Sequence, residues 1–390
     1  MTENKTLSPL TPPRILISGA GIAGLALARR LDSMGIAYTL IEQRDSMQQS
    51  TSGIALPFNA IKALEVLGLD QAVLASAHQV KEVVYCKPSG RILSKASLQQ
   101  PPINQAPYVA LQRSQLHQIL SKDLAQNIHF STSLTDVKQS TNGPATCTFT
   151  DSRLNGEFDL IVAAEGINSP LRQQFCGQKD SIVDYQIPNW RFIVEMPDHG
   201  LQPTYMLGRT ELFMVYPVSP DTLYCYAHVY DEAGQYSTGD AKQHLMQIFS
   251  HFRGSATEIL SKLDDIDVIP GRLRSVDKPY FSNGRVVYVG DAANACSPLL
   301  QQGAAAAFED IICLSTQLKK QGLDDAITAY QQLRSDRIHW VHHASDAPIA
   351  KMKMMQSPIA AFARNTVIRL KGPINVQGWR KLAQQDGLVV

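Results

Sequence analysis

Three glycines near the amino terminus constrain the fold more than any other feature of the sequence. They occur as Gly19-x-Gly21-x-x-Gly24, directly after the apolar run of residues 15–18. The residues that follow have apolar side chains at helical spacing, and a second apolar run ends at Glu42. This order predicts a strand, a tight turn, a helix and a second parallel strand, which is the first unit of a Rossmann-like α/β sheet.

The spacing of these glycines fits a nucleotide pyrophosphate. Gly19 permits a sharp turn with positive φ, Gly21 lets a phosphate approach the backbone, and Gly24 allows close packing of the helix on the sheet. The helix also directs free N–H groups toward that phosphate. Glu42 lies at about the 20-residue distance expected of an acid that binds the ribose of FAD or NAD, but not of NADP. The alternative is a glycine-rich turn in an ordinary α/β protein.

Length and composition restrict the other possibilities. A chain of 390 residues with 44% apolar and 18% charged residues is typical of a globular protein with two packed domains. The net charge of +1 gives no reason to expect nucleic acid as a partner. The six cysteines are scattered without a C-x-x-C pair, which favours reduced thiols over disulfides or a metal site. The first residues lack the apolar core of a signal peptide, and no apolar run approaches the ~20 residues of a transmembrane segment. We therefore expect a cytoplasmic protein.

Two later segments repeat the pattern of a buried strand followed by a turn suited to a ligand. Residues 158–172 contain such a strand and then Glu165, while residues 284–317 contain another with Asp291 at its end. Small residues and glycine at these strand ends allow the backbone to approach a ligand closely. Asp291 is well placed to bond a ligand hydroxyl. The next helix opens at Gly303, where free N–H groups stabilise negative charge.

Two connecting segments are weaker candidates. Residues 53–60 lead into a helix, and this backbone either lies against a ligand or is a loop and helix cap. Arg113 occupies a strand-to-helix junction, where it either pairs with phosphate or ribose oxygens or is a solvated surface arginine.

Short β-branched and aromatic runs between residues 184 and 275 predict antiparallel strands, and residues 80–93 predict a hairpin. Several tyrosines fall in these runs, so the sheet either walls an aromatic-lined pocket or simply packs against the first domain. Tyr216 is our candidate catalytic residue, as a hydroxyl donor to the substrate. The alternative for Tyr216 is a packed strand aromatic.

The predicted fold is a Rossmann-like domain, an antiparallel-sheet substrate domain and a carboxy-terminal helical segment. Residues 348–370 mix methionine and alanine with spaced basic residues. They predict an amphipathic helix at a membrane or a dimer interface, or one packed on its own protein. The expected boundaries are 1–79, 108–180 and 276–340 for the cofactor domain, 80–107 and 181–275 for the substrate domain, and 341–390 for the last helices.

Three motifs in a fixed order carry a family resemblance. They are G-A-G-I-A-G with E-Q-R, then D-L-I-V-A-A-E-G, then R-V-V-Y-V-G-D-A-A with a later proline and Q-G-A. Over residues 14–337 the sequence resembles the FAD-dependent aromatic-ring hydroxylases. These are single-component flavoprotein monooxygenases, and salicylate and para-hydroxybenzoate hydroxylases are members. The resemblance implies that NADH or NADPH reduces FAD and that O₂ then forms a flavin C4a-hydroperoxide, which hydroxylates a small aromatic or polycyclic substrate. We expect a monomer or homodimer without a metal.

The resemblance also implies roles for individual residues. Arg113 anchors the ribityl-pyrophosphate, Asp291 binds the ribityl or pyrophosphate side, and Pro298 lies by the isoalloxazine. Gly303 and Ala304 donate to the flavin pyrimidine, which stabilises the reduced anion. The candidate cofactor-binding residues are Gly19, Ala20, Gly21, Ile22, Ala23, Gly24, Glu42, Gln43, Arg44, Gly53, Ile54, Arg113, Val137, Asp291, Pro298, Gly303 and Ala304.

The sequence departs from the family pattern at three positions. Glu165 replaces an aspartate, Asn294 replaces a frequent histidine, and Gln301 replaces a glycine or alanine. The strand before Tyr216 also lacks the histidine that serves as a base in some phenol-hydroxylating relatives, which argues against a simple phenol substrate.

Three other functions stay open. A flavin-dependent halogenase shares the FAD domain, although the W-x-W-x-I-P signature is absent. An antibiotic-inactivating enzyme similar to the tetracycline-oxidising monooxygenases shares the whole layout. A flavin-binding protein without enzymatic activity would bind FAD yet oxidise no NAD(P)H.

Overall fold

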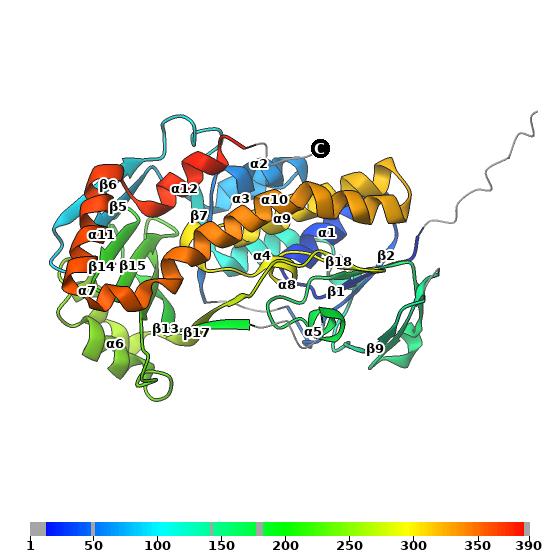
Figure 1. The fold of residues 1–390 in the computed structure, drawn as a ribbon, viewed down its shortest axis with the longest axis horizontal. Helices are drawn as coiled ribbons and strands as arrows, with labels where there is room; N and C mark the ends of the chain where they lie inside the picture. The colour runs from blue at the N-terminus through cyan, green and yellow to red at the C-terminus, as the bar shows by residue number, and fades with distance from the viewer. Residues whose placement is uncertain (1–12, 48–50, 141–142, 177–181, 386–390) are drawn as a thin grey trace, which may run out of the picture.

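A computed structural model describes residues 13–47, 51–140, 143–176 and 182–385. Residues 1–12, whose sequence lacks the apolar core of a signal peptide, lie outside these ranges. Figure 1 shows two large sheets toward opposite ends of the molecule, with the long helix α10 (Leu323–Ala350) running along both. The functional site lies between these two sheets.

The first sheet confirms the predicted Rossmann-like unit. Its pairs are parallel except for the edge pair. All residues of its central strand are buried, because both faces of the sheet are covered. Ile15 and Ile17 face helices, whereas Leu16 faces a small three-stranded sheet. The large sheet is, in spatial order, β18 (Ser282–Asn283), β19 (Val286–Tyr288), β12 (Leu160–Ala163), β1 (Ile15–Ser18), β2 (Tyr38–Ile41) and β8 (Ile128–His129), and the small one is β11 (Gly156–Phe158), β10 (Ala145–Phe149) and β9 (Leu134–Lys138).

The helices that follow these strands share one apolar core with the first sheet. The helix opening at Gly303 is the most enclosed of them, because residues 305–317 are all buried. Any charged side chain on that segment must therefore find partners inside the protein. These helices are α1 (Ile22–Ser33), α2 (Phe58–Val66), α3 (Asp70–Ser76), α4 (Arg113–Ser121) and α9 (Gly303–Lys320). Two further helices, α5 (Pro170–Cys176) and α8 (Asp291–Asn294), contribute Leu171 and Ala293 to the core shared with the small sheet.

The second sheet is antiparallel, as predicted, apart from one parallel pair where the hairpin of residues 82–97 joins it. The hairpin therefore completes a sheet built mainly from residues 182–276. Two helices and several phenylalanines form a separate core on one face. The strands in spatial order are β17 (Ile269–Val276), β13 (Ile182–Glu195), β16 (Thr222–Val229), β15 (Glu211–Pro217), β14 (Thr204–Leu207), β5 (Glu82–Cys86) and β6 (Ile92–Ser97), and the helices are α6 (Ala241–Phe249) and α7 (Ser255–Leu260).

Smaller elements connect the two large sheets and their helices. A three-stranded sheet joins the segment before α2 to the strand before α4, and the predicted boundary at residue 340 falls within α10. In the described part of the chain, no helix combines the length and apolarity needed to cross a bilayer. The connecting elements are β3 (Gly53–Leu56), β7 (Val109–Gln112) and β4 (His78–Gln79), the short turns η5 (Pro298–Leu300) and η6 (Met352–Gln356), and the helices α11 (Pro358–Lys371) and α12 (Ile374–Leu382).

Candidate active site

A cavity of about 1730 Å³ lies between the first sheet and the tyrosine-bearing face of the second. Gly21, Glu42 and Asp291 line it from the first sheet, and Tyr205 and Tyr216 line it from the second. Ligand pockets commonly measure about 300–1,000 Å³. This cavity therefore has room for an extended dinucleotide together with a small substrate.

The three glycines of the first turn have different surroundings. Gly19 has a φ of +104°, and an added Cβ would lie 2.7 Å from the carbonyl oxygen of Ala164. A Cβ on Gly24 would lie 1.9 Å from the carbonyl oxygen of Gly19, whereas a Cβ on Gly21 would meet no protein atom within 4 Å. The packing of the protein itself thus requires glycine at the outer two positions. Gly21 faces open cavity at the start of α1, which is the shape that a pyrophosphate needs.

Glu42 is held at the end of β2 by backbone donors. Its two carboxylate oxygens accept from the N–H of Ala20 at 2.9 Å and from the N–H of Arg44 at 3.0 Å. Each oxygen keeps a second lone pair, so the carboxylate can still accept from ribose hydroxyls. Glu42 lines the cavity together with Gln43 and Arg44.

The start of α4 adds positive charge beside the glycine turn. Arg113 and His117 lie one turn apart on this helix, and both line the cavity. Burial lowers the pKa of His117 to about 4, and the charges of Arg113 and Arg44 contribute. His117 Nδ1 has no hydrogen-bond partner among the described residues. A buried orphaned nitrogen and a guanidinium suit an anionic ligand.

Asp291 begins α8 directly after Gly290, whose φ is +57°. A Cβ on Gly290 would lie 3.1 Å from the Cβ of Ala23, so the loop approaches α1 closely. The Asp291 side chain is open to the cavity but is surrounded by protein, and this burial raises its pKa. A carboxyl in that position can bond a ligand hydroxyl.

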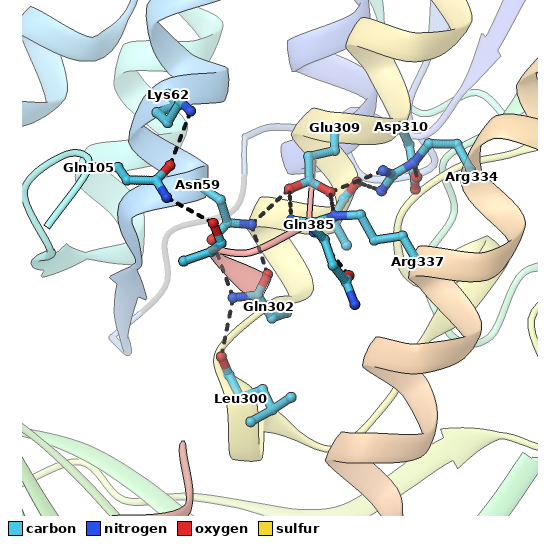
Figure 2. Close-up of polar contacts among 12 residues, drawn as sticks. Asn59, Lys62, Gln105, Leu300, Gln302, Glu309, Asp310, Arg334, Arg337 and Gln385 are labelled. Atoms are coloured by element: carbon cyan, nitrogen blue, oxygen red, sulfur yellow. Dashed lines mark hydrogen bonds and ion pairs between the residues drawn. The ribbon is translucent and has the colours of Figure 1, made fainter. Parts of the chain in front are cut away.

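A buried network of charged and amide side chains ties these loops together (Figure 2). Glu309 accepts from Arg334 at 3.0 Å and from Asn59 Nδ2 at 2.8 Å. Asp310 accepts from Arg334 at 2.8 Å and from the backbone N–H of Gly290 at 3.1 Å. The network thus connects α9 to α10, α2 and the loop that presents Asp291. Its members are Asn59, Asn294, Gln302, Glu309, Asp310, Arg334 and Arg337.

The loop of residues 298–304 connects the cofactor side to the substrate sheet. Pro298, Gly303 and Ala304 all line the cavity, and the first-turn N–H groups of α9 lack intrahelical partners. Gln301 in this loop has a left-handed backbone, with a φ of +53°. Its side chain accepts from Tyr108 Oη and donates to Tyr205 Oη at 2.8 Å.

Tyr216 lies next to this bridge. It is only 1% exposed, and its hydroxyl has no hydrogen bond of good geometry to the described residues, although Tyr108 and Gln301 are adjacent. Burial raises the pKa of Tyr216, so the hydroxyl keeps its proton. An unsatisfied buried hydroxyl that lines a cavity is available to donate to a bound ligand.

One predicted cofactor residue, Val137, has its side chain turned away from the cavity. Val137 is buried in β9 within the apolar core beneath the first sheet and is not among the cavity-lining residues. The loop before β9 and the first residue of the strand line the cavity instead, through Thr132, Ser133 and Leu134. Side chains alternate along a strand, and this one points into the core.

The other predicted cofactor-binding residues differ in whether they line the cavity. Ile22, Ala23 and Ile54 line the cavity, whereas Ala20 and Gly24 lie just behind it. Gly53 also lines the cavity, and a Cβ there would lie 2.6 Å from the Tyr224 side chain. Glycine at position 53 therefore lets β16 of the second sheet approach β3.

Like Gln301, the other two departures from the family pattern have hydrogen-bond partners in the structure. Glu165 accepts from the hydroxyls of Ser18 and Ser169, each at 2.6 Å. Its longer side chain therefore joins the end of β1 to the segment before α5. Asn294 Nδ2 donates to Asp310 at 3.3 Å, so it belongs to the buried network.

Sequence reasoning missed the cavity residue His117 and several side-chain contacts near the cavity. His117 could have been found, because it lies four residues after Arg113 and hence on the same helix face. Tyr205 belongs to the tyrosines of the predicted sheet, but its contacts with Gln301 and Asn375 had no local signal. Asn375 donates to Tyr205 at 3.2 Å from the last helix, and that contact exists only in the folded chain.

Comparison with known proteins defines the class. A family model described as FAD binding domain matches residues 13–345, so the chain belongs to that family. A curated relative, the 2-heptyl-3-hydroxy-4(1H)-quinolone synthase of Pseudomonas aeruginosa, is 28% identical over 370 residues, which cover 91% of this chain and 94% of the relative. Such relatives confirm the expected class of FAD-dependent monooxygenase.

Solved structures confirm the fold. Klebsiella pneumoniae HpxO in complex with FAD and uric acid has a TM-score of 0.83 and 23% identity, over 95% of this chain and 97% of that one. The tetracycline destructase Tet(51) has a TM-score of 0.71 and 20% identity, over 97% and 99% of the two chains. The glycine turn, the paired backbone donors on Glu42 and the open lining at Gly21 fit an FAD in this cavity.

Proposed function

We propose that this protein hydroxylates a small aromatic substrate with O₂, and that NADH or NADPH reduces its FAD. The observation that carries the proposal is that the nucleotide-type turn and the tyrosine face line one cavity. A flavin held by the glycine turn would therefore lie next to a substrate held by the tyrosine face.

The residues of the chain have distinct tasks in this proposal. The N–H groups at Gly21 and the guanidinium of Arg113 hold the pyrophosphate, Glu42 holds the ribose, and Asp291 holds a ribityl hydroxyl. The start of α9 places N–H groups where negative charge is stabilised. Bound FAD supplies the redox and oxygen chemistry, and the chain orients the substrate and excludes water.

The substrate is proposed to be a flat bicyclic heterocycle. The name of the quinolone synthase describes such a ring system, and the HpxO structure contains uric acid, another one. On the substrate side, Tyr205, Tyr216 and Tyr226 offer aromatic faces and hydroxyls, and Arg191 offers a cation. These groups can stack on a ring and bond its carbonyl and N–H groups.

Oxygen uptake by the purified, FAD-loaded protein tests this function. Quinolones, purines, aminobenzoates and tetracyclines should be compared, each with NADH and with NADPH. We expect one ring class to stimulate nucleotide oxidation and to gain one oxygen atom by mass spectrometry. Halide-dependent products would instead indicate a halogenase. A protein that binds FAD but consumes no oxygen with any compound would exclude the proposed activity.

A further inference from the structure

The turn η6 and helix α11 present an apolar face to solvent. Ile359, Phe362 and Leu370 are 80%, 68% and 81% exposed, and Met354 and Val367 are exposed as well. In α11, Ile359 and Phe362 are three residues apart, as are Val367 and Leu370, and at 3.6 residues per turn all four side chains fall on one side of the helix. Large apolar side chains gathered in this way mark an interaction surface, in contrast to isolated exposed ones.

The same segment is strongly basic. Residues 347–385 contain no aspartate or glutamate, although the whole chain has a net charge of only +1. Some of the cations are engaged, since Lys353 pairs with Glu232 and Arg364 donates to backbone carbonyls. Others are exposed beside the apolar face. The basic residues of the segment are Lys351, Lys353, Arg364, Arg369, Lys371, Arg380 and Lys381.

This surface is continuous with the substrate side of the cavity. Met352, Met355, Val367 and Ile368 line the cavity from η6 and α11. Val367 is both one of the exposed apolar residues and a cavity-lining residue, so the apolar face and the cavity meet along this helix. Figure 1 shows α11 at the end of the molecule beside β5, β6 and β14, away from the first sheet. The helix is thus both an outer surface and a wall of the substrate compartment.

We propose that α11 docks on the surface of an anionic phospholipid bilayer, with its apolar face at the boundary between headgroups and acyl chains. At 14 residues the helix is too short to span a bilayer but long enough to lie on one. Arg369 and Lys371 then meet lipid phosphates. An apolar substrate dissolved in the membrane can enter the cavity along Val367 without crossing water.

A second copy of the chain fits this surface less well. A two-fold contact through α11 places the same patch on both sides of the interface. It would therefore bring two basic segments without acidic residues against each other, which Coulomb repulsion opposes. An anionic lipid bilayer matches both features of the segment: acyl chains suit its apolar side chains, and negative headgroups suit its basic ones.

Vesicle flotation with the full chain tests the proposal independently of activity. We expect the protein to float with vesicles of phosphatidylcholine and phosphatidylglycerol, to bind pure phosphatidylcholine vesicles less, and to dissociate as salt is raised. The double substitution Phe362→Ser, Leu370→Ser should weaken binding by roughly tenfold for each side chain removed. Arg369→Glu with Lys371→Glu should weaken it by at least roughly fivefold for each charge.

Matched controls change similar side chains elsewhere on the surface. Met246→Ser with Leu333→Ser removes two other exposed apolar side chains, and Lys319→Glu with Lys320→Glu reverses two other charges. Both should bind as the wild type does, and an unchanged melting temperature should show that all variants are folded. Failure of the wild type to float, or equal binding by the α11 variants, overturns the proposal. So does a dimer in sedimentation that the α11 variants abolish while vesicles remain unbound.

Discussion

The amide of Gln301 donates to Tyr205 Oη at 2.8 Å from a backbone with a φ of +53°. A residue other than glycine or asparagine rarely adopts this left-handed conformation, and the strain costs about 1 kcal/mol. The same side chain accepts from Tyr108, so the two hydrogen bonds offset the strain. The glutamine that departs from the family pattern therefore joins the cofactor-facing loop to the substrate sheet.

Substitution of Gln301 should separate the strain from the bridge. Gln301→Ala loses both hydrogen bonds and keeps the strained φ, whereas Gln301→Gly loses the bonds but relieves the strain. We expect the glycine variant to be more stable than the alanine variant by about 1 kcal/mol, measured by urea denaturation. Gln321 is a matched control with a φ of −153°, where alanine should be the more stable replacement. A Gln301→Ala variant at least as stable as Gln301→Gly would contradict this account.

The glycine turn predicts a division between folding and cofactor binding. Gly24→Ala pushes a methyl group against the Gly19 carbonyl and should destabilise the protein by about 3 kcal/mol or more, with or without FAD. Gly21→Val places its Cβ where no packed protein atom lies within 4 Å, and Gly21 has an ordinary φ of −79°. Its thermal stability without FAD should match the wild type, while FAD affinity falls at least about tenfold, or 1.4 kcal/mol. Flavin titration and differential scanning fluorimetry measure the two effects, and tight FAD binding by Gly21→Val would exclude the pyrophosphate role.

Local patterns were enough to predict the first sheet and its turn. The turn at Gly19, the strand that ends at Glu42 and the helix that opens at Gly303 depend on neighbouring residues in the sequence. Contacts between distant segments could not be predicted in this way. Asn59 bonds Glu309 across 250 positions, and Tyr205 bonds Gln301 across 96. No short motif records such a pair, because only the folding of the whole chain brings the two residues together.

The buried ion network should be the most sensitive polar site for stability. Glu309→Ala leaves Arg334 and Arg337 without a shared partner inside the protein, and removing one member of a buried pair costs about 3–5 kcal/mol. Arg285 and Asp324 form an ion pair in which the Asp324 side chain is 83% exposed, so Asp324→Ala should cost less than about 1 kcal/mol. Chemical denaturation of both variants measures the contrast. If the two variants lost similar amounts of unfolding free energy, the buried network would contribute no more to stability than a surface ion pair.

His228 should make the stability of the protein depend on pH below neutrality. Burial lowers its pKa from 6.5 to about 4, and its Nδ1 lies 3.2 Å from Tyr226 Oη. Between these two values the unfolded chain binds a proton that the folded chain excludes. The free energy of unfolding is therefore fully retained above pH 6.5 and falls as the pH is lowered toward 4, by about 3 kcal/mol in all.

His228→Gln should flatten this slope in urea titrations at several pH values, and His117 accounts for part of the slope that remains. The exposed His343→Gln control should retain the wild-type slope, and an unchanged slope in His228→Gln would show that His228 is protonated equally in both states.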